Sequence, residues 1–122
     1  MRDNITLGRL GENIAISFLK KNGYSILHRN WRCLFGEIDI VAQHEDFIVI
    51  VEIKTRRSSA YGPGYLAITR LKQLKLIRLT QAFLKRYGLT DHMCRIDIVS
   101  IAMDGNSRPV DIELIKDAFW EQ

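Results

Sequence analysis

Residues 36–54 read GEIDIVAQHEDFIVIVEIK and contain two apolar, strand-like runs that carry charges at their ends. Glu37 and Asp39 lie in the first run, and Glu52 and Lys54 close the second. An ionised group among β-branched residues is costly to desolvate unless it is paired, hydrogen-bonded or bound to a cation. Acids that cluster with a lysine in this way indicate a metal site, and such a site favours chemistry on phosphate.

Side-chain alternation decides whether the acids of the two runs can meet. The polar residues 43–46 are the expected turn. If all four form the loop, Asp39 pairs with Ile50 and lies diagonally next to Glu52 on the same face, where the two acids can share a cation. A loop one residue longer or shorter places them on opposite faces unless a bulge intervenes. The second run is apolar on both faces before Glu52, which favours a central strand covered on both sides.

The composition indicates a single domain, residues 1–122, without a disulfide framework. A chain of 122 residues with 47% hydrophobic content can build a sizeable core. Cys33 and Cys94 lack zinc-ligand spacing, so we expect reduced thiols in a cytoplasmic protein. No apolar run is long enough to span a bilayer, and no membrane association is expected. The net charge of +4 is compatible with a polyanionic partner.

An amphipathic helix is predicted at residues 6–22, with Gly23 as its terminator. Glu12 lies beside the apolar stripe of this helix, and Gly8 and Ala15 flank it at helical spacing. Two interpretations stay open. Glu12 is either a buried third carboxylate or a residue that rims the helix.

Three strands are expected next, at residues 24–31, 38–42 and 47–53, followed by a loop at residues 55–68. Gly62-Pro63-Gly64 argues against regular structure in this loop. The loop also carries two arginines and two tyrosines, Arg56, Arg57, Tyr61 and Tyr65. These side chains can contact phosphates and stack on bases, or the loop is solvated and its tyrosines pack locally.

A second helix is expected at residues 69–87, capped by Thr69 and ended by Gly88. Its outer side is basic, and the cations of its early turns, such as Lys72, are candidates for contact with a nucleic-acid backbone. Basic residues on an amphipathic helix also serve simply to keep its exposed face soluble.

Two further strands are expected at residues 93–103 and 110–115. The order of elements is therefore αβββαβ with a C-terminal extension, an α/β fold. Arg95 and Asp97 alternate in the first of these strands, and the sequence does not assign their partners. Structural pairing within the sheet is the favoured role, and an accessory contact with the site is the alternative.

Several short motifs occur in a fixed order along most of the chain. Gly36-Glu37-Ile38-Asp39 and Val51-Glu52-Ile53-Lys54-Thr55-Arg56, with Gly11-Glu12 upstream, resemble the YraN-like family. That family is similar to archaeal Holliday-junction resolvases and to the PD-(D/E)XK nucleases. Supporting motifs are Gly23-Tyr24, Asn30-Trp31, Tyr61-Gly62, Lys72-Gln73 and Arg95-Ile96-Asp97-Ile98-Val99. The resemblance implies a restriction-endonuclease-like fold, in which a mixed central β-sheet is flanked by α-helices.

The same resemblance implies roles for individual residues. Asp39 and Glu52 become ligands of Mg²⁺, for which Mn²⁺ is a possible substitute. Lys54 becomes the catalytic lysine, and Glu12 the helix-borne acid near the metal. One departure is Ile38, which replaces the proline of the PD element without removing a reacting group.

Two further positions complete the implied site. The carbonyl group of Ile53 is a candidate third ligand, because Mg²⁺ prefers oxygen ligands. Gln73 matches a polar position that many relatives direct toward the site.

These features predict an endonuclease that depends on Mg²⁺ and hydrolyses phosphodiester bonds, with structured or branched DNA as the favoured substrate. The expected contacts with nucleic acid are Arg56, Arg57, Lys72 and Gln73. A homodimer is possible, because junction-resolving relatives are dimers. The alternative is a non-catalytic protein that binds nucleic acid or forms complexes while retaining the nuclease fold. A hydrolase of another phosphate ester is disfavoured because GxxxxGK[ST] is absent.

Overall fold

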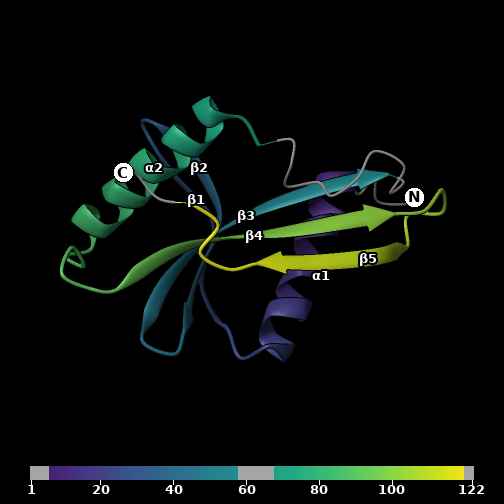
Figure 1. Ribbon diagram of the computed structural model, residues 1–122, viewed down its shortest axis with the longest axis horizontal. Helices are drawn as coiled ribbons and strands as arrows, with labels where there is room; N and C mark the ends of the chain where they lie inside the picture. Colours follow the sequence, from purple (N-terminus) through teal and green to yellow (C-terminus); the bar gives the residue numbers. More distant parts are fainter. Residues whose placement is uncertain (1–5, 58–67, 120–122) are drawn as a thin grey trace, which may run out of the picture.

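The computed structural model describes residues 6–57 and 68–119, which form two helices and five strands (Figure 1). In chain order these are α1 (Leu7–Lys21), β1 (Ser25–Cys33), β2 (Gly36–His44), β3 (Phe47–Arg57), α2 (Arg70–Arg86), β4 (Cys94–Met103) and β5 (Pro109–Ile115). The strands form one sheet in the order β1-β2-β3-β4-β5. Only the β3–β4 pairing in this sheet is parallel, and α2 is the crossover between those two strands. The predicted α/β arrangement with a mixed sheet is therefore confirmed.

The two helices cover opposite faces of the sheet (Figure 1). On the α1 side, Leu19 packs in one core cluster with Val51 of β3. On the α2 side, Phe83 packs in a second cluster with the preceding β3 residue, Ile50. Strand β3 is therefore buried on both faces, as its continuous apolar run predicted.

Each helix begins at a threonine that caps it. The side-chain oxygen of Thr6 accepts a hydrogen bond from the N–H of Arg9, and Thr69 accepts one from Lys72. The second cap fixes the first turn of α2, which carries Lys72 close to Glu52 in the middle of β3. Within the described residues, no helix is both long and apolar enough to cross a membrane.

The strands extend further than predicted. β3 continues to Arg57, because its pairing with β4 runs through Arg56 and Arg57. Residues 55–57 therefore belong to a strand and not to the predicted loop. The strand predicted at residues 110–115 is confirmed as β5, which begins one residue earlier and pairs with β4. The loop tyrosines, Tyr61 and Tyr65, lie outside the described residues.

The turn between β2 and β3 is shorter than predicted, since only residues 45–46 are left unpaired. The predicted pairing of Asp39 with Ile50 is wrong, because Ile50 pairs with Val41. The register of β2 against β3 is therefore displaced by two residues from the predicted register. An even displacement keeps every side chain on its predicted face, so the acids of the two strands can still meet.

Candidate functional site

Two carboxylates meet where β2 and β3 separate. The last registered pair of these strands is Ile40 with Val51, and Asp39 and Glu52 follow it on the two strands. Asp39 Oδ2 accepts a hydrogen bond from the backbone N–H of Ile53 at 2.8 Å. The Asp39 carboxylate thus accepts a hydrogen bond that a backbone carbonyl group of β2 would accept if the strands stayed paired. The two acids are direct neighbours, where the predicted register made them diagonal ones, and they are close enough that each side chain shifts the pKa of the other.

Both carboxyl groups hold a proton more tightly than usual. Burial, and after it the charge of Asp39, raises the pKa of Glu52 to about 7. Burial also raises the pKa of Asp39, although the hydrogen bond from Ile53 acts in the opposite direction. A cation next to the pair favours the charged form of both groups. The position next to the two carboxyl groups is therefore favourable for a bound cation.

Helix α1 brings a third acid toward the pair. Its close approach to β3 depends on Gly11, because a Cβ atom there would overlap the side chain of Thr55. The next residue, Glu12, lines a cavity of about 330 Å³ together with Asp39 and Lys54. Three of the four predicted catalytic side chains therefore line one cavity, and the fourth, Glu52, is buried beside it.

A cation compensates the charge of Glu12. Arg29 donates two hydrogen bonds to Glu12 Oε1, at 3.1 Å from Nε and 2.8 Å from the guanidinium NH2, and Asn30 donates a third at 3.2 Å. The Glu12 side chain is 13% exposed. The structure thus favours the interpretation of Glu12 as a mostly buried acid over that of a rim residue.

The donor atoms fit an open metal site. In the parts of the chain that the structure describes, no group of three or more His, Cys, Asp and Glu side chains is placed to hold a metal ion. Mg²⁺ is usually held by one or two carboxylates, and water and substrate phosphate complete its shell. Asp39 and Glu52 supply two carboxylates, and Ile53, whose carbonyl is the third candidate ligand, lines the cavity. These donors suit Mg²⁺ or Mn²⁺ and do not suit a closed structural zinc site.

Comparisons with known proteins identify the family. Residues 11–101 match the family model of "Uncharacterised protein family UPF0102". The chain belongs to the UPF0102 family. Over 113 residues it is 48% identical to a UPF0102 protein of Caldicellulosiruptor saccharolyticus, covering 93% of this chain and 96% of that protein. It is 42% identical to a UPF0102 protein of Syntrophus aciditrophicus, with coverages of 98% and 92%. The resemblance to the YraN-like family is thereby confirmed.

The UPF0102 match spans the candidate site. Residues 11–101 include Glu12, Asp39, Glu52 and Lys54, and they end before β5 begins at Pro109. The part of the chain that matches the family thus contains all four predicted catalytic positions.

Two residues that were predicted to contact nucleic acid make internal contacts in this UPF0102 protein. Lys72 Nζ lies 3.4 Å from Glu52 Oε2, and this buried acid is only 8% exposed. The side-chain amide of Gln73 donates to the carbonyl oxygen of Ile68 at 3.4 Å. Lys72 therefore belongs to the site as the cationic partner of Glu52, while Gln73 lies in the first turn of α2.

The two predicted arginine contacts continue β3 beyond Lys54. Arg56 and Arg57 pair with Ala102 and Met103 of β4. Arg57 is exposed, and its guanidinium donates to the carbonyl oxygen of Asp104 at 3.5 Å. Both arginines lie on the strand that carries Glu52, with Lys54 between them and that acid.

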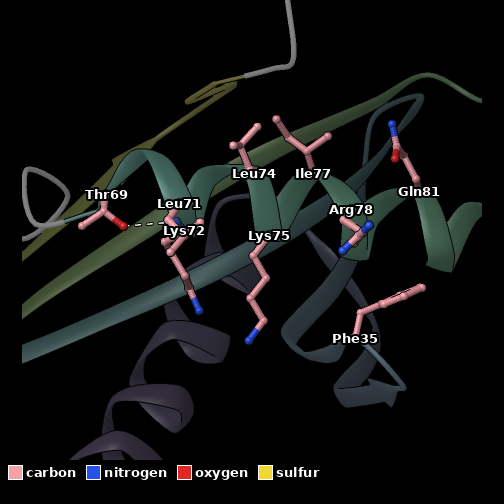
Figure 2. A pocket seen from close by; sticks show the side chains of 9 residues that line it. All are labelled: Phe35, Thr69, Leu71, Lys72, Leu74, Lys75, Ile77, Arg78 and Gln81. Carbon is pink, nitrogen blue, oxygen red and sulfur yellow. Dashed lines mark hydrogen bonds between the residues drawn. The ribbon is translucent and has the colours of Figure 1, made fainter.

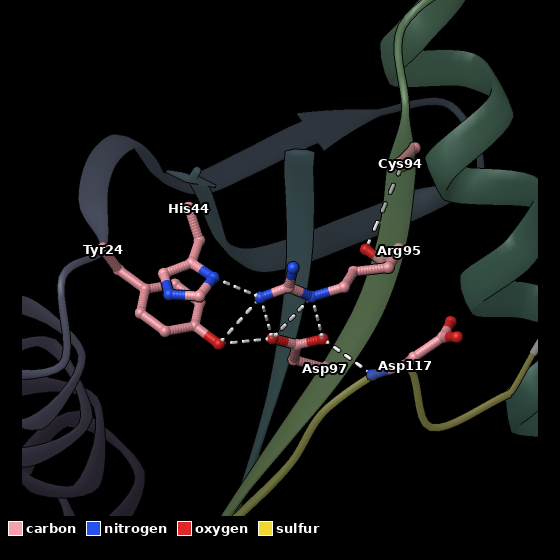
Figure 3. Close-up of polar contacts among 6 residues, drawn as sticks. All are labelled: Tyr24, His44, Cys94, Arg95, Asp97 and Asp117. Carbon is pink, nitrogen blue, oxygen red and sulfur yellow. Dashed lines mark hydrogen bonds and ion pairs between the residues drawn. The ribbon is translucent and has the colours of Figure 1, made fainter. Parts of the chain in front are cut away.

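A buried polar network outside the candidate site joins β4 to three other parts of the chain (Figure 3). Fully buried Asp97 accepts hydrogen bonds from the Tyr24 hydroxyl at 2.6 Å, from Arg95 Nε at 3.0 Å and from the N–H of Asp117 at 3.0 Å. Arg95 also reaches His44 Nδ1 at 2.7 Å. A structural pairing role within the sheet was predicted for these two residues without an assigned partner, and the structure shows that Arg95 and Asp97 pair with each other. Tyr24 and His44 were missed, because no spacing in the sequence links them to β4.

Proposed function

We propose that this UPF0102 protein is a metal-dependent endonuclease that hydrolyses phosphodiester bonds on a restriction-endonuclease-like fold. The observation that carries this proposal is the contact between Asp39 and Glu52 beside a cavity that Lys54 and Glu12 also line. A buried and a half-buried carboxyl group with raised pKa values, a nearby lysine and a third acid are a costly arrangement for a purely structural role.

The chain's own residues would divide the chemistry among them. Asp39, Glu52 and the carbonyl group of Ile53 would hold Mg²⁺ or Mn²⁺. When bound, the cation supplies positive charge to the phosphate and lowers the pKa of the attacking water. The Lys54 ammonium group orients that water or stabilises negative charge that develops on the phosphate. Glu12, which Arg29 holds and which lines the same cavity, would position a water or a second ion.

The proposed substrate is nucleic acid, with structured or branched DNA favoured. Arg56, Arg57 and Lys72 would hold backbone phosphates without reading sequence, and Gln73 would add a polar contact. For Lys72 this role requires that a bound cation take over the neutralisation of Glu52. The two free cysteines, Cys33 and Cys94, suit the cytoplasmic location that the proposal includes. A homodimer would suit cleavage of two strands.

The experiment incubates the purified protein with Mg²⁺ or Mn²⁺ on single-stranded, duplex, flapped and four-way-junction DNA and on matching RNA. The matched variant is Lys54→Ala, whose folding is checked by circular dichroism. We expect cleavage of at least one substrate that stops on chelation and is lost in Lys54→Ala. Absence of cleavage on every substrate with either metal would contradict the proposal.

A second candidate function is a nucleic-acid-binding or complex-forming module without turnover. The observation that favours it is that the chain itself supplies a cation to two of the acids, Lys72 to Glu52 and Arg29 to Glu12. In that case Lys72→Ala would destabilise the fold by leaving Glu52 buried without its partner. Binding of nucleic acid by wild type and Lys54→Ala alike, with no cleavage, would support this candidate.

A further inference from the structure

A groove of about 710 Å³ lies along α2 and reaches the turn between β1 and β2 (Figure 2). Its walls combine apolar residues of α2, such as Leu71 and Leu74, with three cations of that helix and the ring of Phe35. No acid is among the described residues that line it. Glu52 compensates the charge of Lys72, but Lys75 and Arg78 add two further cations to a lining without an acid. The groove therefore complements a polyanion, and it repels the same face of a second copy of the chain.

The three cations form a stripe that starts at the candidate site. Lys72, Lys75 and Arg78 are spaced three residues apart, so they lie about 4.5 Å apart along the axis of α2. Lys72 contacts the buried acid of the site, Glu52. In Figure 2, Lys72 and Lys75 extend side by side from the helix, and Arg78 turns toward Phe35. The stripe therefore connects the proposed reaction centre to the aromatic ring.

Contacts of the second and third cation fix the far end of the stripe. Lys75 packs over Gly36, where a Cβ atom would lie 3.0 Å from Lys75 Cε. The guanidinium carbon of Arg78 lies 5.2 Å from the centre of the Phe35 ring. Gly36 is the first residue of β2, the strand that carries Asp39. Strand β2 therefore contacts the basic stripe through Gly36 and carries Asp39 of the candidate site.

Phe35 is the residue that gives the groove its chemical specificity. Phe35 is 48% exposed as a residue, and the preceding Leu34 is fully exposed. An exposed ring next to a guanidinium group and a row of lysines is the combination that single-stranded nucleic acids use, with bases on the ring and phosphates on the cations. A base inside an intact duplex is already stacked on both sides and cannot use the ring in this way.

We infer that the groove binds an unpaired strand of the nucleic-acid substrate. This inference rests on the proposed function, because the proposed site of cleavage decides toward which end of the groove the strand runs. Phe35 stacks on a base, and Lys75 and Arg78 contact the phosphates on either side of it. Lys72 receives the strand at the candidate site. The substrate feature that the groove selects is thus a single-stranded arm or gap beside the scissile bond.

The test measures equilibrium binding of a fluorescein-labelled single-stranded oligonucleotide by anisotropy, in chelator so that no turnover occurs. Phe35→Leu keeps apolar bulk and removes the π-face, while Phe35→Tyr keeps the π-face. We expect Phe35→Leu to weaken binding at least about fivefold and Phe35→Tyr to stay within about twofold of wild type. Equal affinities for wild type and Phe35→Leu would overturn the inference and would leave an apolar protein segment as the better occupant.

The charged contacts are tested by salt dependence. Lys75→Ala and Arg78→Ala should each reduce the slope of log affinity against log salt by about 0.7, the value for one phosphate contact on a single strand. The matched control is Lys20→Ala, a cation of α1 on the opposite face of the sheet, which should leave the slope unchanged. If Lys75→Ala and Arg78→Ala gave the same slope as Lys20→Ala, the inference would also be overturned.

Binding and cleavage separate this inference from the proposed function. If the oligonucleotide binds through Phe35 but no substrate is cleaved with Mg²⁺ or Mn²⁺, the groove stands and the endonuclease proposal fails. If substrates are cleaved while Phe35→Leu binds and cleaves like wild type, the endonuclease proposal stands and the groove inference fails.

Discussion

The backbone N–H of Ile53 donates to Asp39 Oδ2 at 2.8 Å, at the point where β3 would otherwise bond to β2. This bond ties the position of the acid on β2 to the backbone of β3, so the carboxylate of Asp39 stays next to Glu52 even though the strands separate. Asparagine at position 39 keeps an oxygen that can accept the same bond and removes the charge. The role of the charge can therefore be tested separately from the role of the bond.

Divalent metal should stabilise the protein through this pair. At pH 8, 10 mM Mg²⁺ or Mn²⁺ should raise the melting temperature by about 3–6 °C, because a ligand that binds only the folded state adds to its stability. The rise should be smaller at pH 6, since burial raises the pKa of both carboxyl groups and the metal must compete with protons. Differential scanning fluorimetry of wild type and Asp39→Asn measures both effects. An equal rise in Asp39→Asn would place the metal elsewhere.

The pH dependence of stability should report the protonation of Glu52. The pKa of this group is raised from 4.5 to about 7 in the folded protein. The folded state therefore binds the proton more tightly, and the stability this provides is fully present below pH 4.5 and lost as pH rises through 7. Between these values, the free energy of unfolding of wild type should fall relative to Glu52→Gln by up to about 3 kcal/mol. Urea denaturation at several pH values checks this, and parallel profiles for the two proteins would refute it.

Gly11 should be intolerant of a side chain. A Cβ atom there would overlap Thr55, so Gly11→Ala should lower the free energy of unfolding by about 1–3 kcal/mol and displace Glu12 from the cavity wall. The matched control is Gly8→Ala on the same helix, where nothing lies within 4 Å of the new atom. That variant should be neutral or more stable by up to about 1 kcal/mol. Denaturation curves that show equal effects for the two variants would mean that the contact with Thr55 is not tight.

The network around Asp97 should matter for stability and not for chemistry. Asp97→Asn leaves the buried guanidinium of Arg95 without its charged partner and should cost about 3–5 kcal/mol. Tyr24→Phe removes one hydrogen bond to the same carboxylate and should cost about 1–2 kcal/mol. Urea unfolding measures both costs. Any cleavage or binding activity of folded Tyr24→Phe should match wild type, and a selective loss of activity would show that the network supports the site.

Local patterns in the sequence were sufficient to predict the elements that depend on them. The apolar run before Glu52 specified a central strand, and the threonine and glycine signals set the ends of both helices within about a residue. The face shared by Asp39 and Glu52 was also predicted, although the turn is two residues shorter. An even error in register preserves the face, which explains why a wrong pairing still led to the right neighbours.

Contacts between distant segments were the part that sequence reasoning missed. Arg29 reaches Glu12 only because α1 packs closely on the sheet through Gly11, and no periodicity encodes that approach. The pairing of Lys72 with Glu52 depends on where the crossover helix begins in space. The sequence analysis assigned no role to Phe35, because its exposure follows from the tight β1–β2 turn.

The most direct test of the endonuclease proposal is the cleavage rate of a flapped or four-way-junction DNA by Glu52→Gln compared with wild type. Glutamine has nearly the same shape as the protonated glutamic acid and cannot supply a charge to a cation. We expect wild type to cleave in Mg²⁺ or Mn²⁺ and Glu52→Gln to be at least about a thousandfold slower, with its fold and its affinity for the DNA retained. Cleavage by Glu52→Gln at the wild-type rate would contradict the assignment of the site.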